Sequence, residues 1–374
     1  LERRDNLSIT TTAPNYFVTV INDVNTGSRY VTVADTGNDL LPATGTLGPM
    51  TGGADGLGSI TDTDFSGGLV SGGATGLYVF DQLNDKVDVV ICPDRATAAM
   101  HNSMITYCEI HRDGKLFAIL DPPASQTAAQ MVTYVRDTAA LKGLSEFGAL
   151  YWPRVQVVNP DKTLYGANAN VTIPPSGHIA GVYARVDGRK LGGAFDAPAG
   201  TDGLYRPRNV IGLETAEVNS KAVRDLIVPE GINAIHSADS PLYIDGSRTL
   251  RQDGSFPSIP QRRGMILLEK QLIAGLLFMK HRGITDTWLK AGERTTLLFM
   301  LEYTRANAFA STDPKKAFWV DFGKALNTAA TAATATFYGG IGVATARPGE
   351  FVVLLISPDT RALDAELAAL SAAA

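Results

Sequence analysis

Short apolar runs alternate with amphipathic stretches between residues 77 and 160, and this pattern predicts an α/β layer. The runs Val87–Ile91 and Leu116–Leu120 are typical of parallel strands that are buried on both faces. Each run is followed by a proline and then by a helical pattern. We predict helices over Ala96–Arg112 and Ser125–Lys142, with Gly143 as the C-terminal cap of the second, and further strands over Gly148–Trp152 and Arg154–Val158.

The segment before this layer has a different pattern. Residues 7–34 contain two β-rich runs, Tyr16–Ile21 and Arg29–Val33, separated by turn-forming residues, so we predict a β-hairpin there. Residues 45–76 are rich in Gly, Thr, Ser and Asp. This composition offers too little apolar area for a core, and it predicts a linker or surface loop.

The segment after the layer, residues 213–374, is predicted to be α+β. The pattern predicts helices over Ser220–Val228, Met265–Lys280 and Thr295–Phe309, and strands over Ile232–Ile235, Leu242–Ile244, Phe318–Val320 and Phe351–Ile356. Residues 363–374 are rich in alanine and are expected to form a helix or a frayed tail. The sequence therefore divides into four parts, residues 1–44, 45–76, 77–212 and 213–374.

The most informative stretch is residues 174–203, PPSGHIAGVYARVDGRKLGGAFDAPAGTDG. Pro174 and Pro175 start an extended segment, Ser176–His178 predicts a turn, and Ile179–Val186 predicts a strand or a short helix. The stretch resembles the tail sheath proteins of contractile phage tails and related injection machines. In that family a segment of the form P-P-S-G-H-x-A-G-x-Y-A-R, followed by A-P-A-G-T, is highly characteristic.

Further motifs of the same family occur in the same order along the chain. They are Leu7–Ser8, Ala13–Val18, Thr51–Gly56, Gly231–Ile235, Arg248–Leu250, Arg262–Arg263 and Pro348–Val352. One departure follows the long apolar helix, where Leu276–Gly283 stands in place of the W-x-x-F-E-P-N-like segment of sheath proteins. The local geometry at that point is therefore not predicted by the resemblance.

The resemblance implies a multidomain α/β and α+β fold. Residues 1–44 would be the remnant of a β-sandwich domain, residues 77–212 a subtilisin-like α/β domain without a catalytic triad, and residues 213–374 a C-terminal α+β sheath domain. The family's N-terminal arm would precede residue 1. From that absence we expect this chain alone to be a monomer or a small oligomer.

The resemblance also implies a mechanical function. Sheath subunits form helically stacked hexameric rings around an inner tube and contract to drive that tube through the host envelope for genome ejection. The implied partners are other sheath subunits, the inner tail tube protein, and baseplate and tail terminator proteins. Such a subunit is made in the host cytoplasm and resides in the virion tail. The sheath of a phage-derived bacteriocin or of a type VI-like injection system shares these motifs and is the alternative.

Composition and charge limit the kinds of partner that the sequence predicts. The 374 residues are enough for two or three domains, and 33 basic against 38 acidic residues give a net charge of −5, which does not predict a nucleic-acid partner. Cys92 and Cys108 are too few for a disulfide framework and are expected to be buried thiols. The most apolar stretch, Met265–Met279, is interrupted by Glu269 and Lys270, so membrane insertion is not predicted.

An enzyme of the α/β-hydrolase kind is the alternative from a different class. Polar residues follow the predicted strands, and ligands of open α/β sheets bind beyond the carboxyl ends of strands. Asp94 or Asp121 with His101 or His111 supply two members of a triad. No G-T-S-x-A or G-x-S-x-G turn follows to supply the nucleophile, so we predict no catalytic residue.

Metal and cofactor sites are also not predicted. His101, Cys108, Glu109 and His111 fall within one helical stretch, and three of them share a face, but a zinc site needs a fourth ligand or a recognisable spacing. A helix-surface or core role is preferred. The glycine-rich turn around Asp55 carries an acid where a phosphate cradle needs bare amides or lysine, so no nucleotide is expected.

Two places are candidates for contacts between subunits. Arg262 and Arg263 start the apolar helix, where the helix dipole disfavours cations. They would either meet an acidic patch on a neighbour or on the inner tube, or form a solvated helix start. Phe351, Val353 and Leu355 alternate along the last predicted strand, and the edge of its sheet would accept a strand from a neighbour.

Overall fold

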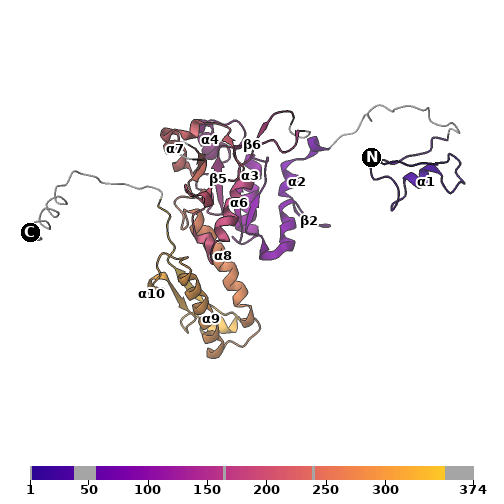
Figure 1. The fold of residues 1–374 in the computed structure, drawn as a ribbon. Helices are drawn as coiled ribbons and strands as arrows, with labels where there is room; N and C mark the ends of the chain where they lie inside the picture. Colours follow the sequence, from indigo (N-terminus) through magenta and orange to yellow (C-terminus); the bar gives the residue numbers. More distant parts are fainter. Residues whose placement is uncertain (1, 38–55, 163–165, 238–240, 350–374) are drawn as a thin grey trace, which may run out of the picture. The chain divides into compact units, whose positions relative to one another are not determined.

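The structure is a computed structural model that describes residues 2–37, 56–162, 166–237 and 241–349 (Figure 1). The chain forms two units, residues 1–59 and residues 60–374. The predicted strand Phe351–Ile356 and the alanine-rich residues 363–374 lie outside the described residues.

The first unit does not contain the predicted β-hairpin. Residues Phe17–Ile21 form the short helix α1, and Arg29–Val33 adopts no regular structure. The backbone of this second run bonds to side chains instead of to a partner strand. The Asn22 carboxamide bonds both the N–H and the C=O of Val33, at 2.9 and 2.7 Å, and the Ser28 hydroxyl accepts two N–H groups at 3.1 Å. Such local side-chain bonds compete with strand pairing.

A five-stranded sheet forms the centre of the second unit, in the order β10-β9-β5-β4-β3. The strands are β3 (Val89–Ile91), β4 (Phe117–Leu120), β5 (Gly148–Trp152), β9 (Ile232–His236) and β10 (Tyr243–Asp245). The first four are parallel, and β10 pairs antiparallel with β9. The predicted parallel arrangement of the strands at 87–91, 116–120 and 148–152 is confirmed.

The sheet also shows that the predicted boundary after residue 212 is wrong. Strand β9 pairs in parallel with β5, with Leu150 opposite Ile232, so the sheet crosses that boundary. A smaller sheet crosses it as well, in the order β7-β6-β8: β6 (Val155–Val158), β7 (Asn170–Ile173) and β8 (Gly212–Leu213). Apolar runs identify strands, but they do not identify the partner along the sheet edge.

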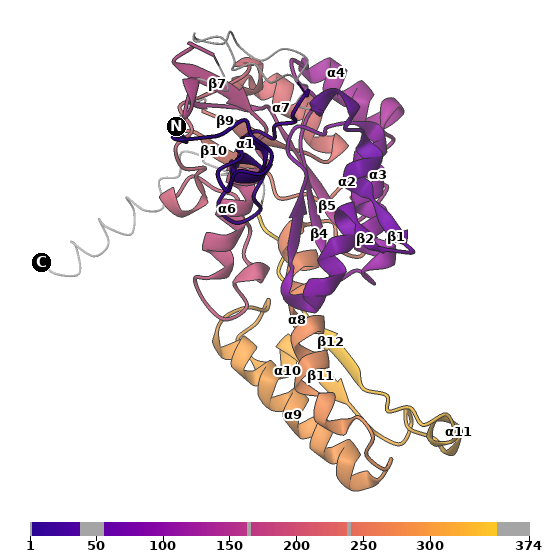
Figure 2. The same ribbon diagram turned by 90° about the vertical axis from the view of Figure 1, so that its right-hand side faces the viewer.

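Helices cover both faces of the large sheet, and successive residues of β4 feed two separate cores. Ala118 and Leu120 belong to one core, and Phe117 and Ile119 to the other. The first core is covered by α3 (Ala98–Thr106) and α4 (Ala128–Thr133), and the second by α6 (Ser176–Asp187) and the start of α8 (Ile259–Gly275). Figure 2 shows α3 and α4 on one side of β4 and β5, and α6 on the other.

Two of these helices end in π-helical turns. Helix α3 continues as η3 (Tyr107–His111), and α4 continues as η4 (Tyr134–Thr138). The second predicted helix therefore ends well before Lys142. Gly143 does have a positive φ of 74°, but its N–H bonds to the carbonyl of Leu250 at 2.9 Å, so it is not the predicted helix cap.

Residues 60–76 are not the predicted linker. They form α2 (Asp62–Ser66) and a hairpin of β1 (Gly68–Val70) and β2 (Gly73–Thr75), and the 3-10 segment η2 (Gly76–Lys86) follows. A capping box starts α2, because Thr61 and Asp64 satisfy each other's backbone N–H groups. Most of residues 45–59 lie outside the described residues, and η1 (Leu57–Ser59) is a single 3-10 turn.

A separate lobe follows the large sheet, and we call it the distal lobe. It comprises the end of α8, α9 (Asp286–Arg305), α10 (Pro314–Ala317), β11 (Phe318–Asp321), α11 (Ala329–Ala333) and β12 (Gly340–Val343). Its core gathers around Met300, Tyr303 and Phe309. Strands β11 and β12 form a two-stranded antiparallel sheet, and Figure 2 shows them in the lobe that contains α9.

The remaining described elements are short. They are α7 (Lys221–Ile227) and the 3-10 turns η5 (Gly193–Phe195), η6 (Gly203–Tyr205), η7 (Glu217–Asn219), η8 (Val228–Glu230) and η9 (Leu277–Met279). The segment Leu276–Gly283, which departs from the sheath motif, thus begins the connection from α8 to α9. None of the helices in the described part of the chain is long and apolar enough to cross a membrane.

Candidate functional site

Asp121 follows β4 directly and is buried. Its carboxylate accepts hydrogen bonds from the Ser176 backbone N–H at 2.8 Å and from the Ser176 hydroxyl at 2.7 Å. Ser176 is the first residue of α6, so the carboxylate faces the positive end of that helix. Burial nevertheless raises the pKa of Asp121 to about 6. The P-P-S-G-H motif therefore places its serine as a helix-start donor to Asp121, and the predicted turn at 176–178 is the first turn of α6.

The other triad candidates have separate partners. Asp94, in the loop after β3, pairs with the Arg154 guanidinium at 2.7 Å. His101 is buried, and its Nδ1 lies 2.9 Å from the Tyr134 hydroxyl. Burial lowers the pKa of His101 to about 4, against the opposing effect of a hydrogen bond with the Asp121 backbone. His101 thus contacts the main chain of Asp121, whereas the Asp121 carboxylate bonds Ser176.

His111 belongs to a cluster that the sequence did not predict. Its Nε2 lies 2.6 Å from one carboxylate oxygen of Asp81, and the Tyr107 hydroxyl donates to the other at 2.8 Å. The Arg112 guanidinium donates to the same carboxylate at 3.3 Å and to the Phe80 carbonyl at 3.1 Å. These bonds fasten η2 to the π-helical turn η3. The cluster joins residues 80–81 to residues 107–112, which are about 30 positions apart, so no short sequence motif predicts it.

The four residues weighed as metal ligands do not converge. Cys108 is fully buried, and burial raises the pKa of its thiol. Glu109 accepts from the Ser145 hydroxyl at 2.6 Å, and the two histidines bond Tyr134 and Asp81. Within the described ranges, His, Cys, Asp and Glu side chains form no group of three that could hold a metal. Cys92 is half-buried, and burial raises its thiol pKa to about 11.

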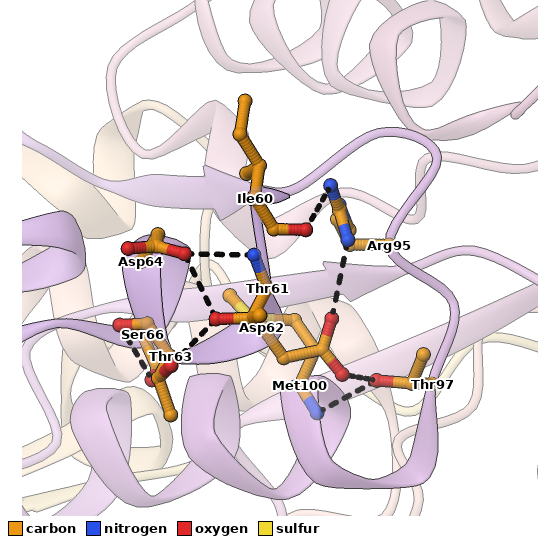
Figure 3. Close-up of polar contacts among 9 residues, drawn as sticks. All are labelled: Ile60, Thr61, Asp62, Thr63, Asp64, Ser66, Arg95, Thr97 and Met100. Carbon is orange, nitrogen blue, oxygen red and sulfur yellow. Dashed lines mark hydrogen bonds and ion pairs between the residues drawn. The ribbon is translucent and has the colours of Figure 1, made fainter. Parts of the chain in front are cut away.

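The loop after β3 is used to hold α2 in place (Figure 3). Thr97 caps α3 by accepting from the Met100 N–H at 3.1 Å, and its own hydroxyl donates to the Asp62 carboxylate at 2.5 Å. Arg95 donates to the Ile60 carbonyl at 3.3 Å and lies 4.6 Å from the ring centre of Phe65. The polar groups past β3, where a ligand of an open α/β sheet would bind, thus make contacts within the chain.

Arg262 and Arg263 are buried, and a solvated helix start is therefore the wrong interpretation. The Arg263 guanidinium forms a two-point pair with the Asp187 carboxylate, one bond of which is 3.1 Å, and stacks 4.0 Å from the ring of Tyr183. Asp187 is the last residue of α6. The pair thus ties the start of α8 to the end of α6.

Arg262 has a different environment. It lies over the ring of Phe147 at 4.4 Å and pairs with Glu269 at 3.3 Å, and burial lowers its pKa. A role of either arginine in contact with a neighbour stays a prediction, since both guanidinium groups already have partners in the chain. The other interface candidates, Phe351, Val353 and Leu355, lie outside the described residues.

A cavity of about 460 Å³ lies beside β10. Its lining combines apolar side chains with charged ones, and the final described residues, Pro348 and Gly349, complete it. Two ion pairs lie in this lining, Lys221 with Asp225 at 2.5 Å and Arg224 with Asp245 at 3.6 Å. The charges of the cavity wall are therefore largely neutralised within the chain, and they do not define a site for a charged ligand.

The fold is similar to that of several solved structures. A chain in the six-fold symmetrised cryo-EM structure of the anti-feeding prophage baseplate is 22% identical, over 76% of this chain and 72% of its own length, with a TM-score of 0.62. A chain in the contracted sheath complex of PVC, an extracellular contractile injection system, is 21% identical over 76% and 75%, with a TM-score of 0.62. A chain in the contracted helical sheath of the anti-feeding prophage is 22% identical, over 76% of this chain and 73% of its own length, with a TM-score of 0.60.

These likenesses show that this chain has a fold similar to that of chains in contractile injection system structures, as the motifs led us to expect. No protein-family model matches the sequence, and no curated protein matches it. The fold is mixed α/β with several sheets, as expected.

Proposed function

We propose that this protein is a structural subunit of the sheath of a contractile injection device. The observation that carries the proposal is the likeness of its fold, over about three quarters of the chain, to chains in two contracted sheath structures. The P-P-S-G-H motif supports it from the sequence side, because this motif resembles the sheath family. In the structure, Ser176 of the motif joins the start of α6 to the end of β4 through Asp121.

A structural role fits the chemistry of the sheet better than an enzymatic one. Beyond the carboxyl ends of β3 and β4, Asp94, Asp121 and His101 bond Arg154, Ser176 and Tyr134 respectively. Catalytic groups need mutual geometry and a place for a reacting atom. The contacts here stabilise the fold, and the neighbours in structure are sheath and baseplate chains.

The finer proposal is that copies surround an inner tube and contract as rearranged rigid bodies, which drives the tube through an envelope. Partners would then be other sheath subunits, a tube protein, and baseplate and terminator proteins. Phage genome ejection and protein delivery by a bacteriocin or type VI-like system are both compatible with this mechanism. The subtilisin-like character of the α/β part and the location in a virion belong to the same proposal.

Electron microscopy of the full-length protein expressed alone tests the proposal. We expect rings or regular tubes in negative stain, and a matching high-mass peak in size-exclusion chromatography. A full-length protein that stays dispersed in all salt, pH and magnesium conditions contradicts it.

The enzyme alternative has its own test. Asp94→Asn and Asp121→Asn variants and the unmodified protein are treated with a fluorophosphonate probe for serine hydrolases. We expect the native protein to be labelled no more than a heat-denatured sample of the same protein. Labelling of the native protein that is lost in Asp121→Asn would favour the enzyme.

A further inference from the structure

Trp319 lies on the outward face of the two-stranded sheet in the distal lobe. Its neighbours in the strand, Phe318 and Val320, pack against the core of the lobe, so the alternation of β11 directs Trp319 away from that core. Directly opposite, on β12, stands Gly342. A Cβ atom at Gly342 would lie 1.9 Å from the indole Nε1, and one at Gly340 would lie 2.9 Å from the indole ring. The two glycines therefore allow the indole to lie across β12.

This packing accounts for only one side of the indole. An aromatic side chain that covers strand glycines compensates for their missing side chains. Trp319 nevertheless keeps 57% of its surface exposed, and Tyr338, two residues before Gly340, keeps 46%. The side chain of Leu326 reaches the same place, since its Cδ1 lies 3.2 Å from the Cβ position of Gly340. We call this surface of Trp319, Leu326 and Tyr338 the Trp319 face.

A rigid, exposed aromatic face has the properties of a protein contact site. Tryptophan and tyrosine dominate the energetic centres of interfaces, and a side chain already held in place loses little entropy on binding. Two exposed lysines precede the strand that carries Trp319. Lys315 and Lys316 in α10, directly before β11, are exposed and form no ion pair with the described residues, whereas Lys324 pairs with Asp286 at 3.3 Å.

We propose that the Trp319 face is a contact between copies of this chain, made with a different and acidic surface of the second copy. The proposal rests on the proposed function. Chains of this fold are found in a helical sheath and in a six-fold assembly, and helical or ring assembly of identical chains uses contacts between two unlike surfaces. The net charge of −5 means that acidic side chains outnumber basic ones in a second copy, which favours contact with Lys315 and Lys316.

Assembly of the full-length protein, followed by sedimentation and negative stain, tests the proposal. Trp319→Ala should raise the concentration needed for assembly at least about tenfold, since the loss of 1.4 kcal/mol per contact has that effect. Leu69→Ala is the matched control, because Leu69 is similarly exposed, at 68%, but lies in the β1–β2 hairpin. We expect this control to assemble like the unmodified protein, and circular dichroism to be the same for all three.

A second variant separates contact from folding. Lys315→Glu with Lys316→Glu changes only exposed side chains, and it should also raise the assembly concentration and reduce its dependence on salt. In assembled particles, a photo-cross-linking amino acid at position 319 should give adducts between two copies, with the second peptide outside the distal-lobe sheet.

The outcomes are distinguishable. Unchanged assembly of Trp319→Ala and of the double lysine variant would overturn the inference and leave the proposed function intact. Cross-links from position 319 only to another protein, such as a tube component, would overturn it in the same way. If the unmodified full-length protein forms no assembly at all, the proposed function fails first, and the inference fails with it.

Discussion

The carboxyl end of the large sheet and the Trp319 face of the distal lobe differ in how they use their side chains. At the sheet end, charged and polar groups bond each other: the buried Asp121 with Ser176, and the exposed Asp94 with the half-buried Arg154. On the Trp319 face, apolar aromatic area remains exposed, and the lysines beside it have no partner among the described residues.

The difference indicates where this chain interacts with other molecules. A sheet whose polar groups are satisfied internally gains stability and leaves little chemistry for a substrate. An aromatic face with free cations is compatible with binding to a protein surface. The candidate residues of the enzyme alternative therefore make contacts within the chain, and the region without a motif carries the contact that we propose.

The largest expected effect separates the two regions by stability. Phe117→Ala removes a fully buried ring from the sheet core and should lower the free energy of unfolding by about 3–5 kcal/mol. Trp319→Ala removes a ring of which more than half is exposed, so its cost should stay below about 2 kcal/mol. Urea unfolding followed by circular dichroism measures both. Equal losses would contradict the distinction between a closed sheet and an open face.

A second test concerns the buried ion pair between α8 and α6. Arg263→Met leaves the Asp187 carboxylate without its partner and should cost about 3 kcal/mol, at the lower end for buried pairs because Asp187 is partly exposed. Adding Asp187→Leu removes the unpaired charge and should recover most of the loss. If the double variant is less stable than Arg263→Met in the same urea titration, the pair is not what joins these helices.

The third test uses pH. The pKa of Asp121 in the folded protein is about 6, above its value in an unfolded chain, so the folded state binds the proton more tightly. Its contribution to stability is thus fully present below pH 4 and is lost as the pH rises through 6. In the unmodified protein this contribution to the free energy of unfolding should fall by about 2 kcal/mol between pH 4 and pH 7. Asp121→Asn should remove this change. Identical pH profiles of urea unfolding for the two proteins would show that Asp121 does not carry it.

The smallest effect is expected at the cap that holds α2 to α3. Thr97→Ala removes the acceptor for the Met100 N–H and the donor to Asp62, and should cost about 1 kcal/mol. Thr97→Ser keeps the hydroxyl and serves as the control. Thermal unfolding measures the difference, and faster hydrogen exchange in residues 62–66 should accompany Thr97→Ala only. A Thr97→Ser protein as unstable as Thr97→Ala would point to packing of the methyl group instead.

The strands of the large sheet were predictable because their signal is local. Leu116–Leu120 and Gly148–Trp152 are apolar runs without a polar face, which only a strand covered on both sides accommodates. The helix α3 was likewise expected from the helical pattern over Ala96–Arg112, and the structure adds Thr97 as its cap. The likeness of the fold to chains in contractile sheath structures was expected from motifs that occur in the family's order along the chain.

The errors occurred where the partner of a residue is distant in sequence. Arg262 and Arg263 have the sequence of an exposed helix start, and only the positions of Asp187 and Phe147 make them buried. The missing hairpin has a nearer cause: Arg29–Val33 has β propensity, but the side chains of Asn22 and Ser28 bond its backbone in place of a partner strand. The Trp319 face was missed because its glycines lie on another strand. A tryptophan opposite a G-x-G strand was the available signal.

The parallel pairing of β5 with β9 has a consequence for how the chain is made. Leu150 meets Ile232 only after the whole intervening segment has left the ribosome. Until then, β5 presents an unpaired and strongly apolar edge to the cell. Closing so long a loop is slow compared with forming local helices. Nascent chains stalled between these two strands should therefore be the species that chaperones capture.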